Sequence, residues 1–366
     1  MRKRLVFVTN DEHLGGPNKV AGRVRCLLTN DFSTITIVQG SNEAGFENDN
    51  SERIIYPSSS ILFLILFIFR EIKQYKSSVY IVFGTKQSLL LSVLKIFFKS
   101  RLALIIRTGL NPAGSIMKKG SFFKDYLQLP LCRKLYIQAN AIITETKSMC
   151  DWWLVEKDGQ LLVRNINNPV KKFPLETSDL ASLESLIGIA SPVLLSIGRL
   201  SYQKDHDFLL KSFARYIDET SNKSAVLLIL GDGEERNTLE KLSIELGINN
   251  NVNFVGHVPN VRPFLERADL YCLTSRWEGG VNSLIEAVYY NSRILALDCP
   301  VGPLDILSDI QGAQIIFNRS EDDFVAAMKQ ILSTEWIHSA NKRNIDSYQN
   351  DYIKNQYKSL INEVEG

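Results

Sequence analysis

The chain has 366 residues, of which 45% are hydrophobic and 22% charged, a composition typical of globular proteins and not of disordered chains. At about 150 residues per domain, this length predicts two domains. The net charge of +2 hides an asymmetry, because residues 1–175 hold 25 Lys and Arg against 13 Asp and Glu, whereas the remainder holds 17 against 27. A first half with a net charge of +12 can indicate an anionic membrane surface or a phosphorylated substrate, although chance variation of the surface explains it as well. Nucleic acid would also attract this charge, but no nucleic-acid-binding motif is present.

The cysteines and the apolar runs indicate the cellular compartment of the protein. The five cysteines are odd in number and widely spaced, which predicts reduced thiols and a cytoplasmic protein. The apolar stretch Leu5–Thr9 is too short for a signal peptide, and the run Ile61–Phe69 is about half of the roughly 20 residues that a membrane span needs. We therefore expect no segment that crosses a bilayer.

Short apolar runs alternate with helix-length segments along the whole chain, which predicts α/β domains with doubly wound parallel sheets. The expected strands of the first half are Leu5–Thr9, Thr34–Val38, Val79–Phe83, Leu102–Ile106, Ala141–Thr144 and Leu161–Val163. Those of the second half are Val193–Ile197, Ala225–Leu230, Asn251–Val255, Leu270–Leu273, Ile294–Leu297 and Gln314–Ile316. Helices are expected at Ser60–Lys76 and Gln87–Phe98, among others.

A domain boundary is predicted where turn residues and prolines gather, from Asn167 to Pro174. This gives an N-terminal domain of residues 1–172 and a C-terminal domain of residues 173–349, with a hinge near 170–190. The helical pattern at about 350–366 is expected to pack back on the N-terminal domain. Two such domains facing each other would leave a cleft at the carboxyl ends of their strands, where ligands of parallel sheets bind.

The first candidate site is Gly15-Gly16, which lies between the first strand and a helix predicted to start near Pro17. Adjacent glycines let backbone amides approach an anion, and a helix N-terminus adds its dipole. A tight turn that needs positive φ explains the same residues, and the spacing is not that of dinucleotide-binding enzymes.

The second candidate site is Gly198-Arg199-Leu200 followed by Lys204, after the strand Val193–Ile197. Two cations in a loop at this edge of a sheet can clamp a diphosphate and neutralise the charge that grows as it leaves. The alternative is an ordinary surface pair. Asp205-His206-Asp207 offers metal ligands, but capping by Asp207 of the helix predicted at 208–217 explains these residues better, so we expect no metal site.

The third candidate site is Glu278-Gly279-Gly280 and Glu286, after the strand Leu270–Leu273. Glu286 falls on the second turn of the next helix and interrupts an apolar pattern, so it is a carboxylate near a core that needs a polar partner. Vicinal hydroxyls of a sugar or ribose fit a carboxylate, and the glycines let backbone amides reach a ligand. Taken alone, two glutamates eight residues apart can also occur by chance, without a shared ligand.

In combination these residues resemble family four of the retaining glycosyltransferases, whose GT-B fold consists of two facing Rossmann-like domains. The family's Glu-x7-Glu pattern is met by Glu278 and Glu286, and its Gly-Arg-Leu-x3-Lys pattern by residues 198–204. Further matches are Gly231-Asp232-Gly233, the segment 252–256, and Asn168-Pro169-Val170. The match is dense over residues 191–312 and thinner before them.

The resemblance implies a role for each matching position. Arg199, Lys204 and Glu278 would be catalytic, the two cations on the donor diphosphate and Glu278 on the transferred sugar, while Glu286 would hold the ribose. The donor site would be completed by Gly15, Gly16, Gly198, Gly256, His257, Gly279, Gly280, Val281 and Asn282, with the base near Gly256 and His257. Family members need no metal, so no cofactor is expected besides the donor substrate, which we expect to be UDP-linked.

The N-terminal half departs from the family pattern. Many members carry a His after the strand that corresponds to Leu102–Ile106, whereas this chain has Arg107 and, further on, Asn111, which would take over contacts on the acceptor side. Segment 116–124 places Lys118 and Lys119 before two phenylalanines and a third lysine, which fits an anionic bilayer or a lipid diphosphate acceptor, although a solvated loop explains it as well.

The resemblance also narrows the expected pathway. The segment Asp298–Asp305 is similar to family members that build bacterial capsule, O-antigen and related glycans, which predicts a glycan or lipid-linked acceptor and a place on the inner face of the cytoplasmic membrane. Two alternatives stay open: a GT-B nucleotide-sugar epimerase, and a non-catalytic subunit that binds sugar nucleotides.

Overall fold

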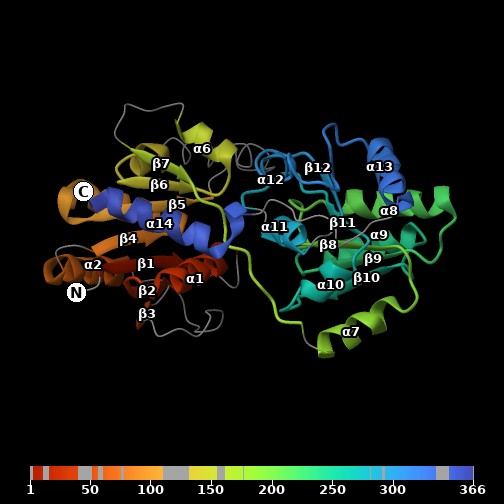
Figure 1. The fold of residues 1–366 in the computed structure, drawn as a ribbon, viewed down its shortest axis with the longest axis horizontal. Coiled ribbons are helices and arrows are strands. Elements are labelled where there is room, and N and C mark those ends of the chain that lie inside the picture. Colours follow the sequence, from red (N-terminus) through yellow and green to blue (C-terminus); the bar gives the residue numbers. More distant parts are fainter. Residues whose placement is uncertain are drawn as a thin grey trace. The chain divides into compact units, whose positions relative to one another are not determined.

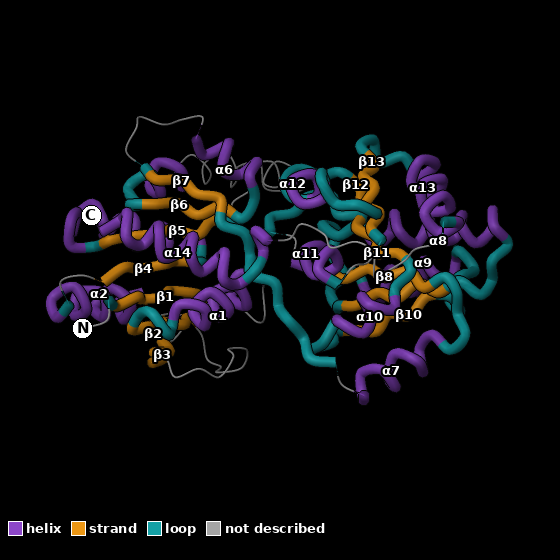
Figure 2. Tube along the Cα trace, viewed as in Figure 1, coloured by secondary structure: helices purple, strands orange, loops and turns teal. Residues whose placement is uncertain are grey.

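A computed structural model describes residues 3–10, 16–39, 52–56, 61–75, 78–109, 132–154, 161–175, 177–280, 282–290, 293–334 and 346–365. The chain divides into two compact units. Unit 1 comprises Met1–Pro169 together with Asp346–Gly366, and unit 2 comprises Val170–Ile345. In each unit the strands form a central layer with helices around it (Figures 1 and 2).

Within the described residues, unit 1 contains a seven-stranded sheet whose strands are all parallel, in the order β3-β2-β1-β4-β5-β6-β7. Its strands are β1 (Arg4–Asn10), β2 (Ser33–Gln39), β3 (Glu52–Tyr56), β4 (Ser78–Val82), β5 (Ala103–Thr108), β6 (Ala141–Thr144) and β7 (Leu162–Asn165). Its helices include α1 (Gly16–Leu28), α2 (Ile61–Gln74), α3 (Thr85–Phe98), α6 (Lys147–Leu154) and α14 (Asn350–Glu365), with 3₁₀ turns η1 (Lys99–Arg101) and η2 (Asp346–Tyr348).

Alternate residues of β1 enter two different cores, as the period of a strand requires. Val6 and Val8 pack in a cluster with residues of α2 and α3, whereas Leu5 and Phe7 pack in a cluster with residues of α1 and α14. Both faces of the sheet are therefore covered, which is the usual condition of parallel sheets.

The last helix belongs to unit 1, although it lies about 180 residues beyond the rest of that unit in the sequence. Figure 1 shows α14, in blue, among the red and orange elements of unit 1. Its residues Ile353, Tyr357, Leu360 and Ile361 are almost fully buried in the core that contains α1. The apolar stripe of α14 therefore packs this helix onto unit 1.

Unit 2 contains, among the described residues, a six-stranded parallel sheet in the order β10-β9-β8-β11-β12-β13. Its strands are β8 (Val193–Ile197), β9 (Val226–Leu230), β10 (Val252–Gly256), β11 (Leu270–Leu273), β12 (Ile294–Leu297) and β13 (Ala313–Ile316). Its helices are α7 (Thr177–Ile187), α8 (His206–Thr220), α9 (Arg236–Glu245), α10 (Arg262–Arg267), α11 (Asn282–Tyr289), α12 (Pro303–Leu307) and α13 (Glu321–Ser333).

The predicted fold class, α/β with two doubly wound domains, is confirmed. Every predicted strand is present to within two residues of its expected ends, and β3 is the strand that the sequence pattern missed. β3 begins with Glu52 and Arg53 and pairs on one side only, with β2, so it lacks the continuous apolar run by which buried strands are recognised.

In unit 2 the direction of winding reverses between β8 and β11, which are neighbours in the sheet although β9 and β10 lie between them in the sequence. Parallel sheets form their ligand sites at such a switch point, beyond the carboxyl ends of the strands. The loops after β8 and β11 carry the second and third candidate sites, so the topology brings these two motifs together.

Candidate functional site

The centre of the candidate site is an ion pair between Lys204, after β8, and Glu278, after β11. Lys204 Nζ donates to Glu278 Oε1 at 2.6 Å, with 17% of the lysine side chain and 5% of the glutamate side chain exposed. The hydroxyl of Ser275 donates to the same carboxylate oxygen. Because a buried charge is costly without a partner, each of these two groups needs the other in the free protein.

Gly198 makes room for the stem of Lys204. A Cβ at position 198 would lie 3.0 Å from Lys204 Cε and 3.1 Å from Cδ, closer than ordinary contact. A side chain here would push the lysine out of its path. The packing of the Lys204 side chain against position 198 therefore explains why the Gly-Arg-Leu pattern begins with a glycine.

The two loops are joined along their backbones. Thr274 Oγ1 donates to the carbonyl oxygens of Lys204 and Asp205, at 3.1 Å each. Arg276 N donates to Gln203 O at 2.8 Å, and the Gln203 side chain donates to Trp277 O at 2.9 Å. These bonds fix the position of Lys204 relative to Glu278 before any ligand arrives.

Asp205 is a second buried anchor of the same site. Its carboxylate accepts from Arg276 Nη2 at 2.6 Å and from Arg319 Nη2, and Arg319 also donates to the carbonyls of Thr274 and Ser275. Arg319 comes from the segment between β13 and α13, far away in the sequence. Asp205 is 4% exposed and adopts φ +53°, a strained conformation for a residue with a side chain.

The proposed capping role of Asp207 is wrong. The helix α8 starts at His206, and the residue at its N-cap is Asp205, whose side chain makes no capping bond. Asp207 is the second residue of the helix, and its carboxylate accepts from Lys211 at 2.9 Å on the exposed surface. The Asp205 side chain does not cap α8, because its carboxylate is paired with Arg276 and Arg319 and not with the amides of the first turn of the helix.

His206, two residues after Lys204 in the sequence, is buried. Its Nε2 lies 3.5 Å from Ser196 Oγ. Burial and, to a lesser extent, the charge of Lys204 lower the pKa of His206 to about 3, so the imidazole is neutral at pH 7. A neutral ring adds no further positive charge next to the lysine.

The glycines after β9 support the loop that carries Arg199. Gly231 has φ +130°, and a Cβ there would lie 2.0 Å from Gly198 O; a Cβ at Gly233 would lie 2.3 Å from Leu200 O. The backbone of one loop thus rests directly on that of the other. Gly231 N also donates to Gly256 O at 2.7 Å, where Gly256 ends β10 at φ +84°.

Arg199 and His257 lie at the surface. The Arg199 side chain is 73% exposed and pairs with Glu234 at 3.1 Å. Such exposed pairs contribute about 1 kcal/mol or less, so the guanidinium can exchange Glu234 for another anion at little cost. His257, next to Gly256, is also exposed.

Glu286 is buried on α11, as its place in an apolar pattern predicted, with 7% of the residue exposed. Burial raises the pKa of Tyr271, and the nearby carboxylates of Glu278 and Glu286 raise it further. Both glutamates therefore lie close enough to the same phenol to act on it. Gly279 and Gly280 are half-buried between them in the sequence, Asn282 opens α11, and Val281 lies outside the described residues.

In unit 1, Arg107 is buried and held by its own unit. Its guanidinium donates to Tyr357 Oη at 2.8 Å, to Ile166 O at 3.2 Å and to Asn168 Oδ1, and it lies 3.8 Å from Glu145 Oε1. Burial raises the pKa of Glu145, an effect that Arg107 opposes. Arg107 thus joins β5 to α14.

The other candidates in unit 1 give less information. Gly16 is the first residue of α1. Gly15, Asn111, Lys118 and Lys119, and with them the segment 116–124, lie outside the described residues. In the part of the chain that is described, no group of three or more His, Cys, Asp or Glu side chains is placed to hold a metal ion.

Three site residues could not be recognised from the motifs alone: Ser275, Arg276 and Arg319. Ser275 and Arg276 lie in the motif that contains Glu278, so their position at the end of a strand was a usable signal. Arg319 carried no such signal in the sequence. Its partner Asp205 lies more than 100 residues earlier, and a single arginine after a strand does not by itself predict a contact.

Comparison with known proteins finds a family match over most of unit 2 and the first part of α14. Residues 185–358, a little under half of the chain, match the family model "Glycosyl transferases group 1". The chain is 25% identical to the amylovoran biosynthesis glycosyltransferase AmsD of Erwinia amylovora over 99% of its own length and 100% of that protein. It is 30% identical, over 52% of its length, to a Campylobacter jejuni N-acetyl-D-galactosaminyltransferase named for an undecaprenol-diphosphate-linked glycan, of which it spans about half (53%).

Among solved structures, the Anabaena protein HepE, crystallised with UDP and glucose, aligns with a TM-score of 0.75 and 13% identity, covering 99% of this chain and 100% of that one. At this identity the likeness shows the fold, which is the GT-B type with two Rossmann-like domains, as predicted.

Proposed function

We propose that this protein is a retaining, metal-independent glycosyltransferase that moves a sugar from a nucleoside diphosphate sugar to a glycan or lipid-linked acceptor. The observation that carries the proposal is the Lys204–Glu278 pair, held at the switch point of unit 2 with Glu286 on the following helix. The family match over residues 185–358 supports it. That match favours transfer over the epimerase and over a non-catalytic subunit.

Binding of the donor would change the ionic partners of Lys204 and Arg199. In the free protein the ammonium of Lys204 is neutralised by Glu278. A donor diphosphate that enters the site offers Lys204 a doubly charged partner and draws Arg199 away from Glu234, a pair that is weak because it is exposed. The Glu278 carboxylate, which also accepts from Ser275, can then accept hydrogen bonds from hydroxyls of the transferred sugar.

The two cations act most strongly when the glycosidic bond breaks. Negative charge on the diphosphate increases at that point, and preorganised positive groups stabilise it without reorganisation. They supply the charge that a divalent ion supplies in other transferases, and for this reason we infer that no metal is needed. Glu286 holds the ribose hydroxyls, and the base lies near Gly256 and His257.

The nature of the substrates is inferred from the relatives. HepE was crystallised with UDP, which supports a UDP-linked donor here. The Campylobacter jejuni relative is named for an undecaprenol-diphosphate-linked acceptor, which supports a lipid-linked glycan. We therefore place this enzyme in the synthesis of a bacterial surface polysaccharide such as capsule or O-antigen, on the inner face of the cytoplasmic membrane.

A panel of nucleoside diphosphate sugars tests the proposal. A donor at 100 times its Kd should stabilise the protein by about 2.7 kcal/mol, visible as a rise in Tm. Release of nucleoside diphosphate from that donor, with an acceptor extract, should continue in excess EDTA. Loss of turnover in EDTA that Mg²⁺ or Mn²⁺ restores would contradict metal independence, and a product anomer opposite to that of the donor would contradict retention.

Glu286→Gln should weaken donor binding by about 10–100-fold, because hydrogen bonds to a charged group contribute about 1.5–3 kcal/mol and the amide accepts fewer of them. The exposed Glu245, on the last turn of α9 in the same unit, provides the matched control, since Glu245→Gln should leave the affinity unchanged. Isothermal titration on both variants gives the answer. Equal affinity in the two would remove Glu286 from the ribose site.

A further inference from the structure

The helix α2 exposes a row of apolar side chains to solvent. Leu62, Leu66 and Phe69 recur at helical spacing on one side, with 66%, 60% and 39% of each residue exposed. The opposite side of the helix, including Leu64 and Ile68, is buried in the core of unit 1. An amphipathic helix of a globular domain normally presents charged groups outward, so α2 is apolar on a face where the fold does not require it.

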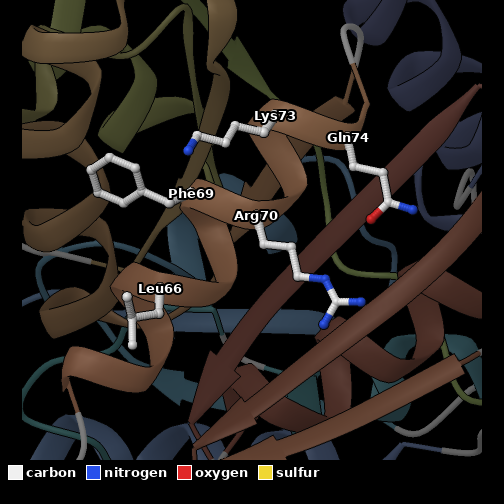
Figure 3. A pocket seen from close by; sticks show the side chains of 5 residues that line it. All are labelled: Leu66, Phe69, Arg70, Lys73 and Gln74. Atoms are coloured by element: carbon white, nitrogen blue, oxygen red, sulfur yellow. The ribbon is translucent and has the colours of Figure 1, made fainter.

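Basic side chains continue this row at the end of α2. Figure 3 shows Leu66, Phe69 and Lys73 projecting from one side of the helix, and Arg70 and Gln74 projecting from the other side in this view. These five residues line a shallow, open hollow. The acidic residue of this helix, Glu71, is buried and paired with Arg4 at 2.9 Å, so it does not oppose the two exposed cations.

The next helix extends the same surface. The ring of Phe98 on α3 packs edge-on against Phe69 of α2, with centroids 4.8 Å apart. On α3, Ile96 and Phe97 are 45% and 76% exposed. Both helices belong to the same core cluster and therefore lie on the same face of the sheet.

Cations also gather at the end of α3. Lys99 and Arg101, in the turn that follows it, are exposed. Both helices connect one parallel strand to the next, so they run in the same direction and end at the same edge of the sheet. Arg70, Lys73, Lys99 and Arg101 thus lie toward one edge of the apolar surface.

We propose that the outer faces of α2 and α3 are a docking surface for an anionic lipid bilayer. Exposed leucine and phenylalanine side chains insert at the boundary of headgroups and acyl chains, while cations at their edge meet the lipid phosphates. The occupant is identified by charge: the surface combines apolar residues with cations, and α2 and α3 carry no exposed acidic residue. A second copy of this surface would repel it, which argues against a symmetric dimer here.

The surface is built from residues of unit 1 that have no part in the proposed donor site, so its test does not depend on the proposed function. Binding is measured by co-sedimentation with vesicles of phosphatidylglycerol and phosphatidylcholine, against vesicles of phosphatidylcholine alone, at low and high salt. The wild-type protein should sediment with the anionic vesicles and be released by salt, because surface cations are screened. Sedimentation that is the same with both vesicles would overturn the proposal.

Two pairs of substitutions assign the binding to this surface. Arg70→Gln/Lys73→Gln should weaken partitioning by about 30-fold, since each cation near an anionic surface contributes about fivefold. Leu66→Gln/Phe97→Gln should weaken it by about tenfold or more. The matched controls are Lys241→Gln and Ile244→Gln, at exposed positions of α9 in unit 2, which should change nothing.

Donor hydrolysis without vesicles should be unaffected in all these variants, so failure of the lipid proposal and failure of the donor proposal can be told apart. Full vesicle binding in both paired variants would overturn the assignment of this surface. A concentration-dependent dimer in light scattering that Leu66→Gln/Phe97→Gln abolishes, with vesicle binding unchanged, would show that a second copy is the occupant.

Discussion

Replacing Lys204 or Arg199 with Ala should lower kcat by about 10²–10³-fold, with a much smaller change in the affinity for the nucleoside part of the donor. Charge on the diphosphate grows as the glycosidic bond breaks, so a cation next to it stabilises the transition state more than the bound donor. The loss should therefore appear in turnover. Steady-state kinetics measures it, with circular dichroism to verify folding.

A matched control separates this effect from simple loss of charge. Lys211 lies on α8, seven residues after Lys204, and its exposed ammonium pairs with Asp207 at 2.9 Å. Because exposed pairs contribute about 1 kcal/mol or less to stability and Lys211 has no part in the proposed site, Lys211→Ala should leave kcat within about twofold of wild type. A kcat near wild type in Lys204→Ala or Arg199→Ala would remove that residue from the mechanism.

The Lys204 variant also changes stability, because Glu278 stays buried without its ammonium partner. Breaking a fully buried pair costs about 3–5 kcal/mol, and this pair should cost less because the lysine is partly exposed. The double variant Lys204→Ala/Glu278→Gln should regain part of this stability but no turnover. If turnover returned as well, neither the Lys204 ammonium nor the charge of Glu278 would be needed for catalysis.

The second large effect is expected for Gly231→Ala, which should lower the free energy of unfolding by about 2–6 kcal/mol and abolish measurable donor binding. The new Cβ would lie 2.0 Å from Gly198 O, so the loop that carries Arg199 and Lys204 would have to move. Backbone strain adds to the clash, because φ is +130°. Urea unfolding and isothermal titration measure the two losses.

Gly247→Ala is the control for strain without a clash. Gly247 also has positive φ, +69°, but nothing lies within 4 Å of the added Cβ. It should cost about 1–2 kcal/mol in stability and leave donor affinity unchanged. If the two variants lost the same stability and neither lost affinity, the contact between the loops after β8 and β9 would not shape the donor site.

The sequence was sufficient for most of the fold, because buried parallel strands are continuous apolar runs. β8, with sequence Val-Leu-Leu-Ser-Ile, and β11, with Leu-Tyr-Cys-Leu, could be predicted for this reason, and their motifs then had to meet once both lay in one sheet. β3 was missed because an edge strand needs no such run.

Side-chain partners far apart in the sequence could not be predicted. The pattern placed Arg107 after a strand, at the edge where ligands bind, but gave no sign of Tyr357, which lies 250 residues later and accepts its hydrogen bond. Asp205 was similar: a short loop with Asp, His and Asp indicated capping, whereas the carboxylate is held by Arg276 and by Arg319 from beyond β13. Neither contact has a local signal.

The most direct test of the donor site is a crystal structure with the nucleoside diphosphate of the active donor bound. We predict that Lys204 Nζ leaves Glu278 Oε1, from which it lies 2.6 Å in the free protein, and comes within hydrogen-bond distance of the diphosphate. Arg199 should leave Glu234 for the same group, and Glu286 should accept from the ribose. A diphosphate bound elsewhere, with the Lys204–Glu278 pair unchanged, would show that this pair is not the donor site.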